Sequence, residues 1–456
     1  MGKYRACIFF GALVREMPEE YAINSVNKYY LDKVLNLAEK ADIKATEDIF
    51  DARGMKLVAK GATISRNLQE RLTQRKLSKP FESSIAVDSG VNIDVISAEA
   101  QRIADTMEPV RSIMRTVSGG ISPLQVLAGV QFGSAMSTML TIIERGGKTA
   151  LEHSVMVSLL SICLAKKFGL SNTDQTVVAL AGLLHDIGEL YIDPEYLHTN
   201  RRLYPHEWRH VVVHPRIGQM LISGLENYPA SVAQAVFEHH ERFDGGGYPR
   251  QIAGNNISAV GQVVSVAEMI SGIFLSQDKP LQRAELALKI LPGEFARELV
   301  SVVSVAMQAT RSPDENAGEE AACPIGEELA SLRNLFDRIE AVHRLRQELI
   351  DRPELQSKKV RQLLTDTERR VIAIQRAFSS TGLDTCLDAE KRFFDTRCTR
   401  VLFEAKVATN EIQWRLRDVA RDLSLTASSM DVTESDMLQP LIALLDGQQQ
   451  PEAVTA

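Results

Sequence analysis

The sequence predicts a mainly α protein made of three parts. Apolar residues recur at spacings of three and four over most of the 456 residues, which is the period of a helix with one buried face. A strand pattern with a turn signal occurs only near residues 45–65. Eight of the nine histidines fall between His153 and His240, at intervals close to the length of a helix and a turn. We therefore expect a helical bundle in the centre, a small N-terminal module of short helices and a β-hairpin, and a helical C-terminal region.

Composition places the chain among ordinary globular proteins. Hydrophobic residues make up 45% and charged residues 24% of the sequence, and the length allows about two to four domains. The net charge of −7 provides no overall basic field for nucleic acid or for an anionic membrane. An anionic substrate would have to be held by local cations or by metal ions, and neither nucleic acid nor a membrane is expected as a partner.

Cysteine usage and hydropathy indicate a cytoplasmic location. The five cysteines are odd in number and no pair has the spacing of a metal site, which fits a reducing compartment. The apolar patch near the N-terminus is interrupted by Gly11 and ends at Arg15-Glu16, so it is too short to span a bilayer. No uninterrupted apolar stretch of about 18 residues follows it.

Residues 1–93 are predicted to form the N-terminal module. A helix is expected over about Lys28–Lys40 and another over about Asn67–Arg75. Between them, two short runs, Glu47–Phe50 and Met55–Ala59, flank the turn-forming segment Asp51–Gly54. This arrangement predicts a β-hairpin.

Residues 94–310 are predicted to form a helical, metal-binding domain. The first histidine-bearing helix covers about Leu151–Phe168 and ends at Gly169, a residue suited to the left-handed position after a helix. The next helix is expected to be capped by Asn172-Thr173 and to run into His185-Asp186. We expect the series of ligands to continue in this way, one step per helix.

Residues 324–447 are predicted to form the helical C-terminal region, after a polar loop over Arg311–Cys323. Helices are expected at about Glu354–Phe378 and Asp384–Leu423, beyond a break at Pro353. An apolar stripe with helical spacing precedes them. It can be the core of a bundle or a dimerising coiled coil. The second interpretation implies a homodimer or protein partners. The members of the stripe are Leu329, Leu332, Phe336, Ile339, Val342, Leu345 and Leu349.

The histidine series has the chemistry of a metal centre. Histidine is the commonest metal ligand, and here it recurs next to acids: His153, His185-Asp186, His214-Pro215, His239-His240-Glu241, and then the carboxylate of Glu268. This number of ligands exceeds what one tetrahedral structural ion needs, which favours a catalytic centre with two ions. Two ions together can activate water and hold the oxygens of a phosphoryl group.

Three motifs resemble the HD-GYP family, a branch of the HD metal-dependent phosphohydrolases. They are His185-Asp186-Ile187-Gly188, His214-Pro215-Arg216-Ile217-Gly218 and the long run from His239 to Pro249, and the resemblance covers about residues 149–295. It implies an all-helical bundle that hydrolyses cyclic di-GMP with two or three metal ions. It further implies Fe or Mn as the metal, with Zn or Ni as alternatives, and Asp186 as the bridging carboxylate. The implied ligands are His153, His185, Asp186, His214, His239, His240 and Glu268.

The run Asp244–Pro249 is expected to line the pocket. Its three glycines permit backbone torsions closed to other residues and allow a ligand to approach closely. Glu241 and Asp244 can either orient histidine rings or, for Asp244, begin the glycine turn. The resemblance assigns substrate contacts to Gly247, Tyr248, Pro249, Arg250 and Lys279.

Several positions depart from the family pattern. Glu189 occupies the place of a lysine that meets the scissile phosphate, and Gln262 replaces an arginine. Glu268 is one methylene longer than the usual aspartate, and Thr149 replaces a glutamate used by three-metal members. The metal ligands are thus kept while the phosphate-binding cations are reduced, which predicts two divalent ions rather than three.

These departures leave more than one function open. The leading hypothesis is a slow phosphodiesterase for cyclic di-GMP with Asp186 and Glu189 as catalytic residues, slow because an anion beside a phosphate costs a few kcal/mol. The alternative is a degenerate HD-GYP module that binds a nucleotide or partner proteins without turnover. Hydrolysis of another phosphate ester is a third interpretation, since the HD ligand set is not specific for one substrate.

Overall fold

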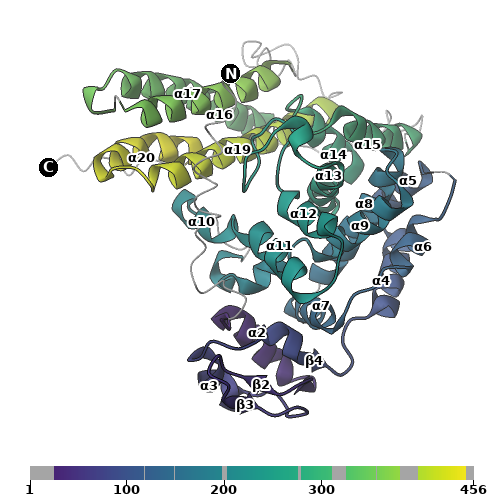
Figure 1. Cartoon of the computed structure of the whole chain (residues 1–456). Coiled ribbons are helices and arrows are strands. Elements are labelled where there is room, and N and C mark those ends of the chain that lie inside the picture. The colour runs from purple at the N-terminus through teal and green to yellow at the C-terminus, as the bar shows by residue number, and fades with distance from the viewer. Residues whose placement is uncertain are drawn as a thin grey trace. The chain divides into compact units, whose positions relative to one another are not determined.

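The computed structural model describes residues 25–117, 119–147, 149–197, 203–275, 279–310, 325–355, 357–380 and 399–447. Over these ranges the chain is mainly helical (Figure 1), and its sheets are two small antiparallel pairs. The predicted mainly α fold is confirmed. The chain divides into two compact units, the first made of residues 1–200, 210–281 and 293–310, the second of residues 201–209, 282–292 and 311–456. The three predicted domains, with the boundaries 1–93, 94–310 and 324–447, stay predictions.

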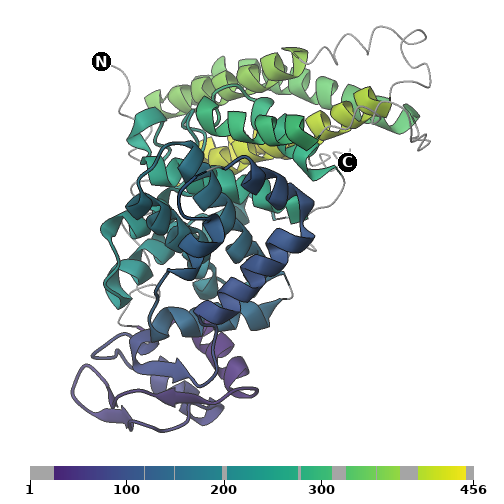
Figure 2. The same ribbon diagram turned by 90° about the vertical axis from the view of Figure 1, so that its right-hand side faces the viewer.

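The N-terminal module contains the predicted hairpin (Figure 2, dark purple). Its turn is held by Asp51, whose Oδ1 accepts the backbone N–H groups of Arg53 at 2.9 Å and Met55 at 2.8 Å. A second strand pair, β1 with β4, was not predicted, because each strand has three residues and its partner lies 40 residues away along the chain. The elements are α2 (Lys28–Ala38), β1 (Ile43–Ala45), β2 (Ile49–Phe50), β3 (Lys56–Val58), η2 (Arg66–Leu68), α3 (Gln69–Thr73), η3 (Phe81–Ser84) and β4 (Ile85–Val87).

The helices that follow in the first unit surround one buried helix, α8, whose residues from Ser154 to Ala165 are all buried. An all-round apolar helix of this kind belongs in the middle of a bundle. The elements are α4 (Ile93–Thr106), α5 (Glu108–Arg115), α6 (Pro123–Ala128), α7 (Ser134–Gly146), α8 (Ala150–Lys167), α9 (Asn172–Leu184), η4 (Ile187–Tyr191), η5 (Pro194–Tyr196), α11 (His214–Leu225), α12 (Ala230–Glu238), η7 (Gly254–Asn256), α13 (Ala259–Leu275) and α15 (Arg297–Thr310).

Helices α8 and α9 pack closely, and this packing brings the start of one to the end of the other. A β-carbon at Gly182 of α9 would lie 2.7 Å from the Cα of Ser158, so only glycine allows this approach. The prediction for α8 is confirmed, including the positive φ of 78° at Gly169 after its end. The predicted cap of α9 is wrong by one residue, because the Ser171 side chain accepts the N–H of Asp174.

The second unit is a bundle whose core is formed by the C-terminal helices. Its elements are η6 (Pro205–Glu207), most of α14 (Pro280–Lys289), α16 (Ile325–Ile350), η9 (Pro353–Leu355), α17 (Lys358–Ser380), α19 (Thr399–Ala427) and α20 (Val432–Asp446); α10 (Trp208–Val211) spans the boundary between the units. Residues 311–323 and the first part of the helix expected over 384–423 lie outside the described residues.

The apolar stripe on α16 lies in the core of this bundle. Leu332, Ile339, Val342 and Leu349 are each at most 2% exposed and pack with residues of α17, α19 and α20, while Phe336 and Leu345 are partly buried against the same core. This packing accounts for the stripe within a single chain. Of the helices in the described ranges, none is both long and apolar enough to cross a bilayer.

Within the first unit, the N-terminal module packs on η4 through aromatic residues. The rings of Tyr30 and Tyr191 stack with their centroids 5.1 Å apart, and the Tyr191 hydroxyl donates a hydrogen bond to the Glu82 carboxyl. Phe81 lies edge-on to Tyr30 at 6.5 Å. Glu82 is 2% exposed, and burial raises its pKa to about 7 although the Tyr191 hydroxyl favours the charged form.

The raised pKa of Glu82 predicts a pH-dependent stability. Because the folded protein holds this proton more tightly than the unfolded chain, the stabilisation is complete below the ordinary carboxyl pKa and is lost as pH rises to about 7. The loss amounts to about 3 kcal/mol. Glu82→Gln cannot ionise and keeps an acceptor for Tyr191, so it should lose less stability than the natural chain between pH 5 and pH 8, measured by urea unfolding with a chelator present. Glu70→Gln, at an exposed position of α3, is the matched control, and an equal pH dependence in all three proteins would contradict the prediction.

Candidate metal centre

The structure brings all seven predicted metal ligands together in two adjacent groups. Among the described residues, one group holds Asp186, His214, His239 and His240, and the other holds His153, His185 and Glu268. Within each group the candidate ligand atoms lie within 4.8 Å of one another. This is the convergence that the spacing predicts, and metal ligation itself stays a prediction.

The candidate ligands lie mostly at helix ends. His185 and His239 are the residues that terminate α9 and α12, His214 is the first residue of α11, and His153 lies in the first turn of α8. Helix ends leave backbone carbonyls without partners inside the helix. Those carbonyls are therefore free to fix a histidine ring.

Three rings are fixed in this way. The Nδ1 atoms of His185, His214 and His239 lie 2.8, 2.8 and 2.5 Å from the carbonyl oxygens three residues earlier, which belong to Gly182, Val211 and Val236. A carbonyl oxygen only accepts, so each Nδ1 must carry a proton and donate it. In a neutral ring the Nε2 atom then presents a lone pair to the centre of the site. Without a metal, a charged His185 ring instead donates from Nε2 to the carboxylates of Asp186 and Glu268.

This geometry fits a bound cation. His214 Nε2 and His239 Nε2 lie 3.2 Å apart, and two lone pairs at that distance cannot form a hydrogen bond with each other. Both side chains are at most 2% exposed, so water cannot easily relieve the contact. A shared metal ion satisfies both nitrogens at once. Imidazole and carboxylate donors suit Fe, Mn, Zn or Ni, so the donor set agrees with the predicted metals.

Asp186 lies between the two groups. Its Oδ2 is 2.9 Å from His185 Nε2, while its Oδ1 faces His214 Nε2 at 3.6 Å and His239 Nε2 at 3.7 Å. Each carboxylate oxygen thus points to a different group, as a bridging ligand requires. Glu268 of α13 belongs to one group alone, with its Oε2 3.0 Å from His153 Nε2 and 3.1 Å from His185 Nε2.

The electrostatics of the two groups differ. Burial opposes a charged His185 ring, but Asp186 and Glu268 outweigh it and raise the pKa of His185 well above its usual range. Burial and the neighbouring His239 lower the pKa of His214 to about 4, and burial with the same neighbours holds the pKa of His240 well below normal. Without a metal, His185 is therefore a charged ring between two carboxylates, whereas His214 and His240 are neutral. The group with His214, His239 and His240 is called the imidazole-rich group below.

The glycine-rich run lies directly on the imidazole-rich group. The Tyr248 ring stacks on His240 with centroids 4.5 Å apart, and the Tyr248 N–H donates to the His240 carbonyl at 3.0 Å. Gly245 has a positive φ of 85°, as expected for a turn glycine. Gly247 was expected to be glycine so that a ligand could approach. A β-carbon there would also collide with the backbone of His240 and Arg242, so the protein itself needs the space. Pro249 follows in a cis peptide bond.

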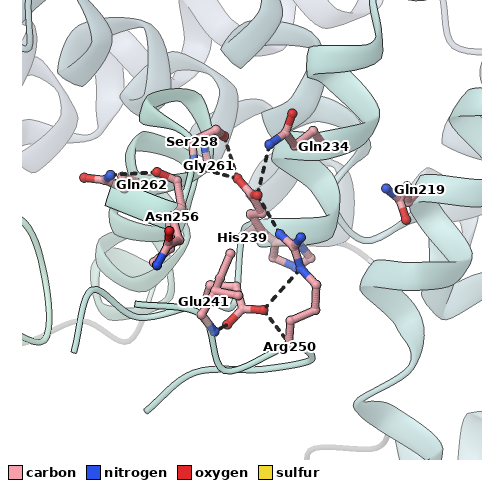
Figure 3. Close-up of polar contacts among 12 residues, drawn as sticks. Gln219, Gln234, His239, Glu241, Arg250, Asn256, Ser258, Gly261 and Gln262 are labelled. Carbon is pink, nitrogen blue, oxygen red and sulfur yellow. Dashed lines mark hydrogen bonds and ion pairs between the residues drawn. The ribbon is translucent and has the colours of Figure 1, made fainter. Parts of the chain in front are cut away.

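Arg250, predicted to contact substrate, is engaged by the protein. Its Nη2 donates to Glu238 Oε1 at 2.6 Å, and its guanidinium lies 4.6 Å from the centroid of the Phe237 ring. Figure 3 shows its side chain next to Glu241, whose Oε1 accepts the Arg250 backbone N–H at 2.7 Å. Lys279, the other predicted cation, is exposed at the bend before α14. The substrate contacts of both residues stay predictions.

The sequence interpretation missed Glu238, gave Glu241 a role that the structure does not show, and included the observed role of Asp244 among its alternatives. Glu238 is fully buried and accepts hydrogen bonds from the side chains of Arg250, Gln234 and Ser258. Glu241 holds the backbone N–H groups of Arg250 and Ile252 and not a histidine ring. Asp244 accepts the N–H of Gly246 at 2.8 Å and so begins the turn. A charged residue on each side of two histidines was the signal that could have revealed this network.

Glu189 and Gln262 stand at the two positions where the resemblance led us to expect cations. Glu189 is partly buried in η4, and its backbone N–H donates to the Asp186 carbonyl at 2.9 Å. Burial and the nearby Asp186 carboxylate raise the pKa of Glu189 well above its usual range. The Gln262 side chain donates to the Ile257 carbonyl at 3.0 Å.

Comparison with known proteins agrees with the motifs. Residues 137–291 match the family model of the HD domain. This part of the chain is an HD domain. The resemblance drawn from the motifs over about residues 149–295 is confirmed.

The HD domain is similar to several curated phosphodiesterases. It is 30% identical over 143 residues to 3′3′-cGAMP-specific phosphodiesterase 3 of Vibrio cholerae, covering 31% of this chain and 30% of that protein. It is 33% identical over 131 residues to a cyclic di-GMP phosphodiesterase of Pseudomonas aeruginosa, covering 29% of this chain and 31% of that protein. The corresponding enzyme of Thermotoga maritima is 32% identical over 148 residues, which cover 31% of this chain and 40% of that protein.

These matches span about a third of the length of the curated relatives. Among solved structures, an HDG"Y"P protein of Bdellovibrio bacteriovorus, Bd1817, is similar with a TM-score of 0.31 and 16% identity, over 60% of this chain and 97% of that one.

Removal of one imidazole ligand tests the centre. His239→Ala should lower the affinity for Mn²⁺ or Zn²⁺ by at least about tenfold, since even residues that only orient a ligand cost 10–100-fold. The measurement is metal content after loading and dialysis, together with a chelator competition. His343→Ala removes a histidine of α16 in the second unit, which bonds Gln375 and belongs to neither group, and serves as the control. Equal metal binding by both variants would refute the assignment.

Proposed function

We propose that the HD domain of this chain is a metal-dependent phosphodiesterase that hydrolyses a cyclic dinucleotide, with cyclic di-GMP as the substrate. The observation that carries this proposal is the pair of ligand groups joined by Asp186, whose oxygens face opposite groups. The similarity to curated phosphodiesterases for cyclic di-GMP and 3′3′-cGAMP supports the substrate class.

In this proposal the chain holds two divalent ions. His153, His185 and Glu268 would hold one, His214, His239 and His240 would hold the other, and Asp186 would contribute a carboxylate oxygen to each. When bound, such ions withdraw charge from a phosphoryl oxygen and make water a better nucleophile. The hydrogen bonds from Nδ1 to backbone carbonyls keep the three buried rings in the orientation that leaves Nε2 free for a metal.

The remaining residues of the site would position the substrate and exclude water. The Tyr248 ring, stacked on His240, provides a flat apolar wall beside the imidazole-rich group. Glu238 and Glu241 hold the segment that carries Tyr248 and Pro249 through Arg250. Protonation of the leaving 3′ oxygen would come from water or from a protonated Glu189, since no lysine stands at that position.

The proposed enzyme is slow. Glu189 puts a carboxyl where a cation would meet the phosphate, which costs a few kcal/mol at close range. The amide of Gln262 is used on a backbone carbonyl, and the guanidinium of Arg250 is paired with Glu238. Few cations of the described site therefore remain for a phosphate.

The same observation favours a second candidate, a domain that binds a cyclic dinucleotide without turning it over. Loss of phosphate-directed charge affects the transition state more than the ground state, because negative charge on the phosphoryl oxygens develops during the reaction. Such a domain would keep its metals and its nucleotide affinity. The two candidates differ in turnover alone.

Purified, metal-loaded protein should hydrolyse cyclic di-GMP slowly, and the activity should disappear on metal removal and return on readdition. The measurement is product formation by chromatography over long incubation, with 3′3′-cGAMP and a linear dinucleotide as comparison substrates. Intact cyclic di-GMP that nevertheless binds in a calorimetric titration would replace the enzyme with the binding domain. Absence of both turnover and binding would sink the cyclic-dinucleotide proposal altogether.

Glu189→Lys should raise the turnover of cyclic di-GMP by about tenfold or more, equivalent to about 1.4 kcal/mol, because it restores a cation beside the phosphate. Metal content should stay unchanged. Glu144→Lys, the same charge change on α7 of the HD domain, is the matched control and should have no effect. A lower or equal rate in the Glu189 variant with full metal content would count against the proposed role of this position.

A further inference from the structure

The segment that follows Asp186 is η4, and it is packed between the N-terminal module and α11. Asp186 immediately precedes η4, and Glu189 bonds back to its carbonyl. On one side, α2 of the module contacts η4; on the other, α11 does. Any shift of η4 therefore moves Asp186 relative to the histidines of α11 and α12.

On the α11 side there is no free space. A β-carbon at Gly188 would collide with the carbonyl oxygen of His214 and would come within 2.9 Å of the backbone nitrogen of Gly218. Gly218 in turn lies against a side-chain carbon of Val236, in the last turn before His239. The position of η4 is thus transmitted directly to two ligand-bearing helices by backbone contact.

On the other side, Lys33 of α2 binds the C-terminal end of η4. Its Nζ donates to the carbonyl oxygens of Leu190 at 2.9 Å, Glu189 at 3.2 Å and Ile192 at 3.4 Å. An ammonium group has three protons, so these three carbonyls use all its donors. Carbonyls at the end of a helix carry partial negative charge, which makes a cation there stabilising. The Glu189 carbonyl also accepts the backbone N–H of Ile192 at 3.2 Å.

Burial of the Lys33 ammonium group costs free energy, which its hydrogen bonds to η4 must offset. Burial lowers its pKa to about 8, although Glu189, Asp193 and Asp32 favour the charged form. Lysine seldom loses its water to bind only backbone carbonyls. The stack of Tyr30 on Tyr191 and the bond from Tyr191 to Glu82 fix the same segment within a few residues of the lysine contact.

We infer that Lys33 is a positioning residue of the metal centre: through η4 it fixes Asp186 between the two ligand groups, so that docking of the N-terminal module sets the metal affinity of the HD domain. This inference rests on the proposed metal site and is independent of the substrate. The module thereby gains a role in the chemistry although it supplies no ligand.

The test is the metal affinity of the full chain without substrate. Lys33→Met keeps the alkyl stem and removes the three donors, and it should weaken Mn²⁺ or Zn²⁺ binding by about tenfold in a chelator competition. Lys40→Met, at an exposed position just after α2, is the matched control and should bind as the natural chain does. Unchanged affinity in the Lys33 variant would overturn the inference.

A double-mutant cycle separates positioning from a general loss of stability. In an Asp186→Asn background, Lys33→Met should cause little further loss of metal affinity, because the residue through which it acts has been changed. A further loss as large as in the natural background would show that Lys33 acts elsewhere and would refute the inference. If Lys33→Met does not fold, Lys33→Arg and Lys33→Gln probe the same contact, with affinity falling in that order if the inference holds and equal affinities if it fails. A natural chain that binds no metal would instead remove the proposed function.

Discussion

The structure depends on a set of buried imidazoles whose lone pairs point at one another. Each ring of His185, His214 and His239 gives its Nδ1 proton to a carbonyl of the preceding turn. A neutral ring then has an acceptor facing inward, and the Nε2 atoms of His214 and His239 lie 3.2 Å apart with no donor between them. Such an arrangement is unfavourable by itself in a water-poor interior. A bound cation would use these lone pairs as ligands. Burial would then strengthen the attraction between the cation and the nitrogens, whereas without a cation it penalises their unpaired lone pairs.

The packing of the helices around this centre fixes the helix ends that carry the candidate ligands. Helix α8 is buried on every side and packs on α9 at a glycine, which places the first turn of one next to the last residue of the other. Free carbonyls at helix ends supply the acceptors that orient the rings. The bundle thus positions ligands with backbone groups that a helix leaves unused.

Outside the ligand groups, charged side chains fix backbone segments near the centre. Glu238 and Glu241 organise the loop that carries Tyr248, and they use the guanidinium of Arg250 for this purpose. Lys33 performs a related task from the N-terminal module, at the end of η4. Two cations close to the centre therefore stabilise backbone segments, and the segment after Asp186 carries the carboxyl of Glu189.

The sequence by itself determined the helical class, the hairpin near Asp51, the residues that converge at the candidate site and the HD assignment, because these follow from local periodicity, turn chemistry and residue spacing. It could not give the direction of a side chain at a helix end, so it left open whether Glu241 orients a histidine ring. The pairing of β1 with β4, the ion pair of Arg250 with Glu238 and the contact of Lys33 with η4 join residues from 12 to 157 positions apart, with no periodic signal. Only the tertiary structure decides such contacts, since they arise from packing between elements and not from the preferences of either element alone.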